Sequence, residues 1–382
     1  ELNIDDISLD EMVIEEIKRQ HSGTYPIMPE PVDEFPKSGS IDLSDHLHFI
    51  RRQGGAGCWG YSMLAIWDIM NEMACPFSPN LSMRLWMMLH RRRELWSNNN
   101  PKGIFSPDCR YHKMTNPEWG FLQSFGNTTE GTEPTLHNYP ALWPDGGWSK
   151  EGINEADNYR LKSSPKSIVV SSDSFINCLS GGFPIRLCYE IIYTKDGQVK
   201  KSGHFIAVVG YDLNKKEFKY VNSVGDKWNN GGMGTFTFSE VDDCQLNNSS
   251  LGNHKITSAE IVEIFPPEPV PVARIHIKHT NRANLHLWLG IEDSPHPKNQ
   301  IWPHGWNDNS SNLYFTVRLP GEFIWPPSKS NRIVLEIFDA GTYSQSGGEL
   351  IELTVAFGLH TFSALQLPVK FNSGDRKVVY VS

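Results

Sequence analysis

Cys58 stands directly behind a glycine-rich stretch and at the start of an apolar one, in the sequence QGGAGCWGYS at residues 53–62. A thiol at a helix N-terminus meets unpaired backbone N–H groups and the positive end of the helix dipole, which favour the thiolate. The thiolate is the form that attacks a carbonyl carbon, so Cys58 is a candidate nucleophile. A lone cysteine is more often a small buried hydrophobe, and the hypothesis therefore requires a partner base. The helix itself is predicted from apolar residues at steps of three and four, namely Trp59, Met63, Ile66, Trp67, Met70, Met73 and Ala74.

His204 is the candidate base, because it begins an apolar run, Phe205–Val209, that is typical of a buried strand. Asn222 lies at the end of the next predicted strand, and residues 212–215 are predicted to turn the chain between the two. Antiparallel pairing would place the side-chain carbonyl of Asn222 beside His204, where it can hold one imidazole tautomer. Cysteine, histidine and asparagine in this arrangement form the thiol version of the serine triad.

Several blocks of the chain, over residues 28–265, resemble the papain-like cysteine peptidases. In the family order these blocks are residues 28–35, the approach to the nucleophile at 41–62, the central stretch at 127–134, the histidine strand at 202–212 and the asparagine loop at 222–236. The resemblance implies an α+β fold with a helical lobe, an antiparallel β-barrel lobe and a cleft between them. It also implies an endopeptidase that hydrolyses polypeptides through a thioester acyl-enzyme and requires no cofactor.

By that resemblance, Cys58 is the nucleophile, His204 the general base and acid, and Asn222 the orienting residue. Gln53 and the backbone N–H of Cys58 would form the oxyanion hole. Chain spacing indicates no metal site, since no Cys/His cluster has zinc spacing. The residues expected to contact substrate are Trp119, Gly120, Gly203 and Phe205, and those expected to support the site are Trp59 and Trp228.

The chain departs from the family pattern at three positions. Gln53 lies five residues before Cys58 where the family has six, Val224 replaces a tryptophan that shields the asparagine, and Gly55 replaces a cysteine of the first family disulfide. The shortened spacing and the missing tryptophan motivate an alternative from another class, a binding or adhesion protein on a peptidase-like scaffold with little turnover. Acyl transfer to an amine, by the same residues, is a third interpretation.

A proline-rich segment, PPEPVP at residues 266–271, is predicted to be a stiff linker. Beyond it, residues 272–382 alternate apolar and polar residues in short runs, which favours a β-sandwich or jelly roll. Residues 275–289 and 333–357 resemble the P domain that follows the catalytic domain in proprotein convertases and many bacterial secreted proteases. The predicted strands are Val272–Thr280, Leu285–Glu292, Leu313–Leu319, Ile333–Phe338, Leu350–Phe357, Ala364–Pro368 and Lys377–Val381.

The resemblance to a P domain implies a module that stabilises the catalytic domain or docks it to a protein or glycan surface. Asp339, Glu292 and Asp293 are candidate calcium ligands there, although loop carboxylates are more often simply solvated. His276 and His279 lie three apart on a strand and therefore point to opposite faces, which argues against a shared metal.

The overall composition describes a globular protein with a formal net charge of −9 and a pI of about 5.9. That acidity argues against nucleic-acid binding, which normally needs a basic face. No apolar run approaches the roughly 20 residues of a membrane-spanning helix. The chain starts at Glu1, and we expect a secreted protein whose leader has been removed, with residues 1–27 as an N-terminal extension.

Six cysteines bear on the redox state. If Cys58 is a nucleophile, an odd number remains, and these cannot all pair internally. Two alternatives stay open, namely one or two disulfides, with Cys75–Cys109 and Cys178–Cys188 as the candidate pairs, or buried free thiols.

Overall fold

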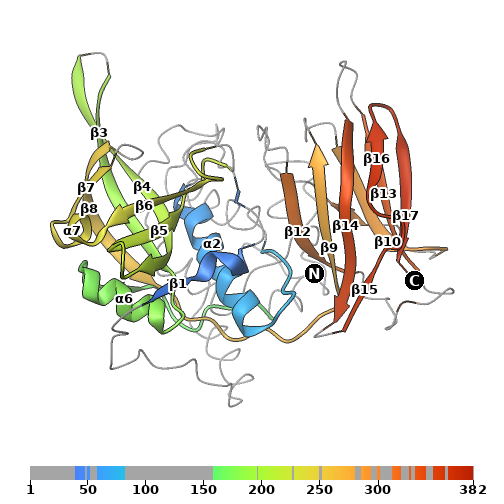
Figure 1. Ribbon diagram of the computed structural model, residues 1–382, viewed down its shortest axis with the longest axis horizontal. Coiled ribbons are helices and arrows are strands. Elements are labelled where there is room, and N and C mark those ends of the chain that lie inside the picture. Colours follow the sequence, from blue (N-terminus) through green and yellow to red (C-terminus); the bar gives the residue numbers. More distant parts are fainter. Residues whose placement is uncertain are drawn as a thin grey trace, which may run out of the picture.

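β-strands make up most of the described chain, and one long helix, α2 (Cys58–Ala74), lies among them (Figure 1). Three shorter helices accompany it, η2 (Leu43–His46), α6 (Ser172–Ser180) and α7 (Phe238–Asp242). In this computed structural model the described residues are 39–47, 50–51, 58–81, 158–195, 197–225, 228–248, 252–279, 285–293, 299–301, 312–319, 327, 332–340, 347–357 and 360–381.

Helix α2 begins at Cys58 and buries the side chains of the predicted apolar face as far as Met70. Met73, by contrast, is 37% exposed, because the helix ends one residue later. Residues of other helix faces, such as Leu64 and Ile69, are also fully buried. The helix packs against β3, β4 and η2, and Figure 1 shows it between the two β regions, where Glu72 pairs with Arg274 of β9.

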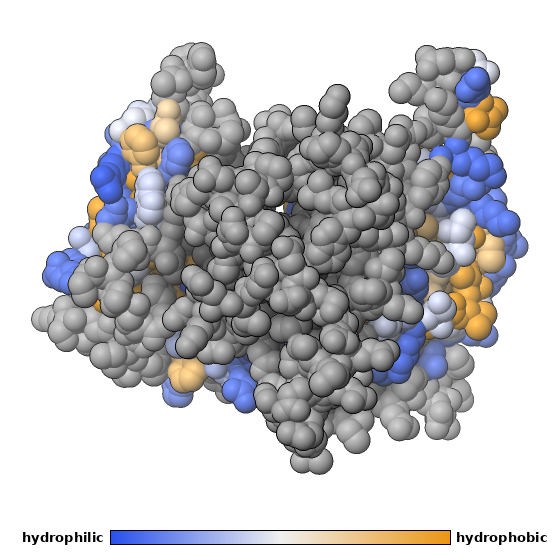
Figure 2. Space-filling model, turned by 180° about the vertical axis from the view of Figure 1, so that it is seen from behind, coloured by the Kyte–Doolittle hydropathy of each residue, from blue (hydrophilic) through white to orange (hydrophobic). Residues whose placement is uncertain are grey.

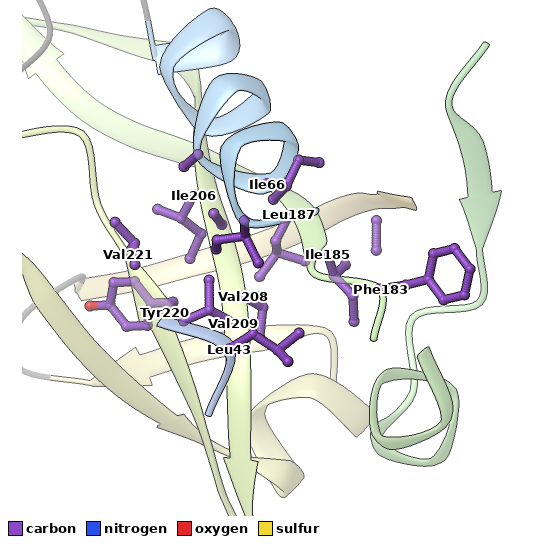
Figure 3. Packing of buried hydrophobic residues seen from close by; sticks show 14 of the residues in the cluster. Leu43, Ile66, Phe183, Ile185, Leu187, Ile206, Val208, Val209, Tyr220 and Val221 are labelled. Atoms are coloured by element: carbon purple, nitrogen blue, oxygen red, sulfur yellow. The ribbon is translucent and has the colours of Figure 1, made fainter. Parts of the chain in front are cut away.

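An eight-stranded antiparallel sheet follows the order β2-β8-β3-β4-β5-β6, with β1 added beside β4 and β7 beside β8. Its long hairpin, β3–β4, turns at Gly197, whose φ of 73° suits glycine. Ile66 of α2 packs against Leu187 of β3 and Ile206 of β4 (Figure 3). The strands are β1 (Ser40–Asp42), β2 (Lys166–Ile168), β3 (Ile185–Lys195), β4 (Gln198–Asp212), β5 (Glu217–Val221), β6 (Met233–Thr237), β7 (Gln245–Asn248) and β8 (Gly252–Ile261).

Two further antiparallel sheets, in the orders β11-β10-β13-β17 and β12-β9-β14-β15, share one hydrophobic cluster. Strand β16 pairs with β14 beside the second path. The strands are β9 (Val272–His279), β10 (Leu285–Ile291), β11 (Asn299–Ile301), β12 (Asn312–Arg318), β13 (Ile333–Asp339), β14 (Gly347–Phe357), β15 (His360–Ser363), β16 (Val369–Asn372) and β17 (Arg376–Val381).

The structure corrects two expectations about these elements. The predicted strand Ala364–Pro368 is wrong, since the chain bends there and strands β15 and β16 lie on either side of it. Helix α7 was not expected, although Thr237 and Glu240 form a capping box at its start. A helix of five residues is too short to show an apolar period, so the capping box was the sequence feature that could have indicated this helix.

The described residues form two hydrophobic clusters, one drawn from residues 43–264 and the other from residues 273–381. Hydrophilic and hydrophobic side chains are interspersed on both flanks of the molecule in the view of Figure 2. Across the described part of the chain, every helix is too short or too polar to cross a membrane.

Candidate active site

Cys58 is the first residue of α2, and its side chain is buried, at 7% exposure. Burial raises the pKa of the thiol, while the backbone N–H of Phe205 lowers it, and the charge of Arg186 lowers it further. Burial dominates, so the helix terminus does not leave a thiolate at rest as the sequence suggested. A buried thiol of this kind needs a base to remove its proton.

His204 and Asn222 form a direct hydrogen bond, with 2.9 Å between Nε2 of the ring and Oδ1 of the amide. Both side chains are buried, at 8% and 4% exposure. Strand β5 ends at Val221, which pairs with Ala207 of β4. Strand β5 therefore does not pair with the earlier β4 residues, which include His204. Asn222 follows directly and folds onto His204, as the sequence predicted.

The tautomer of His204 follows from the contacts of Asn222. The Oδ1 of Asn222 also accepts the backbone N–H of Ser223 at 2.8 Å, which identifies this atom as the oxygen of the amide. An oxygen cannot donate, so Nε2 of His204 carries the proton. The other ring nitrogen, Nδ1, then holds the lone pair that can take a proton from a thiol.

The surroundings of His204 favour the neutral ring. Burial lowers its pKa, the hydrogen bond to Asn222 raises it in part, and His254 lowers it again. Tyr189 packs edge-on against the imidazole at 5.4 Å and stacks on His254 at the same distance. The ring is therefore an unprotonated base over most of the neutral range.

The thiol and the imidazole come from opposite ends of the sequence block, and adjacent residues of β4 relate them. Phe205, whose N–H acts on the Cys58 sulfur, is the residue next to His204. No hydrogen bond joins the thiol to the imidazole among the described residues. Both groups are neutral at rest, so the arrangement is a thiol with a nearby base rather than an ion pair.

Three residues of β3 border this region and were not predicted from the sequence to lie at the site. Arg186 is 5% exposed, bonds to Glu260 at 2.9 Å and lies over the Phe205 ring at 4.2 Å. Cys188 pairs with Phe205 and Tyr189 with His204 in the β3–β4 register. Only that register brings them to the site; a buried arginine within an apolar strand was the one sequence feature that could have drawn attention.

The remaining predicted residues divide into described and undescribed ones. Gly203 and Phe205 flank His204 on β4, and Trp59 is buried in the core cluster. Trp228 packs against Tyr220, with ring centroids 6.1 Å apart. Gln53, Trp119 and Gly120 lie outside the described residues, so the expected oxyanion hole and substrate contacts stay predictions.

A small cavity lies beside Asn222, between the first turns of α2 and the end of β5. Asn222 and Arg51 form parts of the same wall. The lining residues are Leu47, Ile50, Arg51, Tyr61, Ser62, Ala65, Val221, Asn222 and Ser223.

The candidate calcium ligands do not come together. Asp339 is buried at the end of β13, bonded to His279 at 3.1 Å, whereas Glu292 pairs with Arg332 at the opposite end of the β10–β13 pair. Within the described part of the chain, no group of three His, Cys, Asp or Glu side chains is placed to hold a metal.

The candidate disulfide Cys178–Cys188 is wrong, since both thiols are free. Cys75 is also free, and its candidate partner Cys109 lies outside the described residues. Cys178 is buried in the core cluster, where burial raises its pKa to about 11.

Known structures similar to this chain are cysteine proteases. Xylellain, a cysteine protease from Xylella fastidiosa, has a TM-score of 0.42 and 16% identity, over 63% of this chain and 91% of its own. The bromelain protease from Ananas comosus has a TM-score of 0.35 and 15% identity, over 59% of this chain and 98% of its own. A ragweed pollen cysteine protease in its proform has a TM-score of 0.39 and 14% identity, over 65% of this chain and 74% of its own.

No family model and no curated protein sequence matches the chain. TM-scores below 0.5 do not establish a shared fold, and the case for function rests on the residues of this chain.

Proposed function

We propose that the chain is a cysteine endopeptidase in which Cys58, His204 and Asn222 act as a relay. The observation that carries the proposal is the buried His204–Asn222 hydrogen bond, set beside a helix that begins with a buried thiol. This hydrogen bond holds the imidazole in one tautomer, with Nδ1 unprotonated, which is the state that a general base for a thiol requires.

In the proposed mechanism, Nδ1 of His204 takes the Cys58 proton as the sulfur attacks the scissile carbonyl carbon. The tetrahedral oxyanion is held by the Cys58 backbone N–H and the Gln53 side chain. The imidazolium then protonates the leaving amine, which departs and leaves a thioester on Cys58. Water, deprotonated by His204, hydrolyses the thioester and restores the thiol.

Because both groups are neutral at rest, His204 must remove the Cys58 proton during the reaction. In an enzyme with a preformed ion pair, that proton has already been transferred. Proton transfer must accompany attack, because burial disfavours the separated thiolate and imidazolium. Positioned proton transfer of this kind contributes about 10²–10⁴-fold to a rate.

Labelling by a thiol-directed epoxide tests the proposal. We expect stoichiometric labelling at pH 7 together with cleavage of an unfolded protein substrate, both abolished in Cys58→Ala. Cys178→Ala is the matched control, since it removes another buried thiol and should leave both intact. Labelling that persists in Cys58→Ala, or cleavage that does, would refute the assignment of the nucleophile.

A second candidate, a binding protein with little turnover, is favoured by one observation. Burial raises the pKa of Cys58, and no hydrogen bond joins its thiol to the imidazole within the described residues. This function predicts no epoxide labelling at neutral pH and unchanged ligand capture in Cys58→Ala. The labelling experiment therefore separates the two candidates.

The same proposal extends to the organisation and setting of the chain. Residues 28–265 would be the two-lobed peptidase, residues 266–271 a linker and residues 272–382 a P-domain-like β-sandwich or jelly roll, with residues 1–27 as an extension. The substrate would be a polypeptide outside the cell, and the sandwich would contact a protein or glycan surface. Secretion from an expression host tests the extracellular setting. A glycan-array screen with the full chain tests whether residues 272–382 contact a glycan surface.

A further inference from the structure

Asn80 makes a two-point hydrogen bond with the edge of the C-terminal sheet. Its backbone N–H donates to the carbonyl of Thr316 at 2.8 Å, and its Oδ1 accepts the Thr316 N–H at 2.7 Å. Thr316 lies on β12, the edge strand of the five-stranded sheet. Asn80 and Thr316 are 2% and 0% exposed. One asparagine thus takes the place that a neighbouring strand would fill.

The Asn80 side chain also reaches α2 on its other side. Its Nδ2 lies 3.4 Å from Oδ2 of Asp68, and the next residue, Leu81, donates its N–H to Oδ1 of Asp68 at 3.0 Å. Arg51 closes the group, with Nη1 on Asp68 at 2.6 Å and Nη2 on the Leu81 carbonyl at 2.9 Å. We call the series Thr316, Asn80, Asp68 and Arg51 the polar chain.

A second contact holds the same helix to the same sheet. Glu72, one turn after Asp68 on α2, pairs with Arg274 of β9 at 3.1 Å. Arg274 also lies over the ring of Phe77 at 4.4 Å. Figure 1 shows α2 between the two β regions. Through these contacts, the C-terminal sheet is joined to the helix that carries the candidate nucleophile.

The polar chain is linked to the candidate site in two ways. Asp68 is on the same helix as Cys58, ten residues along, and a helix rises about 1.5 Å per residue, so the two are about 15 Å apart on one rigid element. Arg51 shares the wall of the small cavity with Asn222, which orients His204. A shift of Asn80 would therefore reach both the sulfur and the amide.

We propose that the C-terminal sheet sets the position of α2 and of Asn222 through the polar chain, and that Asn80 and Asp68 are positioning residues for the candidate site. This inference rests on the proposed function for its catalytic consequence, but the positional coupling stands independently of turnover. The covalent chemistry stays with Cys58 and His204.

The test is Asn80→Ala, which removes the acceptor for the Thr316 N–H and the contact to Asp68. Asn214→Ala, at an exposed turn between β4 and β5, is the matched control. We expect kcat on a peptide substrate to fall at least tenfold with KM within about twofold, and amide hydrogen exchange of Ser62–Trp67 to accelerate at least threefold. Unchanged kcat and unchanged exchange would overturn the inference.

The exchange measurement distinguishes this failure from failure of the proposed function. Faster exchange in Asn80→Ala, with no peptidase activity in any variant including the unaltered protein, would support the coupling and refute the peptidase. A lower kcat with unchanged exchange would refute the coupling, since α2 would then not have moved.

Asn80→Asp keeps the test decisive if Asn80→Ala does not fold. The carboxylate can still accept the Thr316 N–H, but it faces Asp68, whose own partner of opposite charge is Arg51. Two buried carboxylates so close must share a proton, and low pH relieves their repulsion. We expect the kcat ratio of Asn80→Asp to the unaltered protein to rise at least fivefold from pH 8 to pH 5; a constant ratio would refute the inference.

Discussion

The buried ion pair between Arg51 and Asp68 provides a quantitative test of the structure. The side chains are 3% and 4% exposed, and 2.6 Å separates Nη1 from Oδ2. Asp68→Ala would remove the carboxylate that pairs with the buried Arg51 guanidinium, and breaking a buried pair by removing one partner typically costs about 3–5 kcal/mol. The Leu81 N–H would also lose its acceptor, adding about 1 kcal/mol or more. We expect a loss of about 4–6 kcal/mol in the free energy of unfolding.

Urea unfolding followed by far-UV circular dichroism measures this loss, with the slope of free energy against urea as a check that the transition is unchanged. Lys166→Ala is the control, because Lys166 pairs with Glu263 at 2.7 Å but the two side chains are 52% and 25% exposed. An exposed pair contributes about 0–1 kcal/mol. The two distances are nearly equal, so burial, together with the lost Leu81 hydrogen bond, accounts for the expected difference.

A double variant, Arg51→Met with Asp68→Leu, separates two contributions to the free energy of unfolding. One is the cost of removing a single partner of the buried pair, and the other is the net contribution of the intact pair. Replacing both partners by apolar groups of similar volume removes the buried charge, and this is often neutral or stabilising. We expect the double variant to be more stable than Asp68→Ala by about 2 kcal/mol or more. The reasoning is refuted if Asp68→Ala costs no more than 1 kcal/mol beyond Lys166→Ala.

Three further predictions follow from the site and its supports. Burial lowers the pKa of His204, so the acid limb of kcat/KM should have its midpoint below pH 6.5, with activity lost as pH falls through the lowered pKa. Asn222→Ala removes the hydrogen bond that raises this pKa and should move the limb to still lower pH; a midpoint at or above 6.5 in the unaltered protein contradicts the first statement, and an unmoved or raised midpoint in Asn222→Ala contradicts the second. Gly210→Ala would place a Cβ 2.4 Å from a β1 carbonyl oxygen and should cost about 1–3 kcal/mol in urea unfolding, whereas Gly203→Ala meets its nearest atom at 3.8 Å and should cost little. Asn80 begins an Asn-x-Ser glycosylation sequence, yet it is buried and hydrogen-bonded through its side chain, so peptide mass mapping after expression in a glycosylating host should find it unmodified; a glycan there would contradict the docked arrangement.

Local patterns were sufficient to predict the elements that carry the candidate site. The three- and four-residue apolar steps predicted α2, which begins at Cys58, and the apolar run after His204 predicted β4. The pairing of His204 with Asn222 also followed from the sequence, because two strands joined by a short turn have few ways to align. Each of these inferences depends on neighbours within about twenty residues.

The ionisation of the site was not predictable in this way. A helix N-terminus favours a thiolate, and this effect is local, so the sequence indicated a lowered pKa for Cys58. Burial acts in the opposite direction and is stronger here, and it depends on what packs over the sulfur after folding. Arg186 and Tyr189 reach the site only through the register of β3 with β4.

The sequence by itself determined helix α2, strand β4 and which histidine and asparagine meet, since periodicity and turn residues act over short distances along the chain. Only the tertiary structure decided that Asn80 bonds to Thr316, 236 positions away, and that the C-terminal sheet thereby bears on α2. Hydrogen bonds between such distant residues leave no periodic trace, because each depends on a single donor and acceptor brought together by the packing of everything between them.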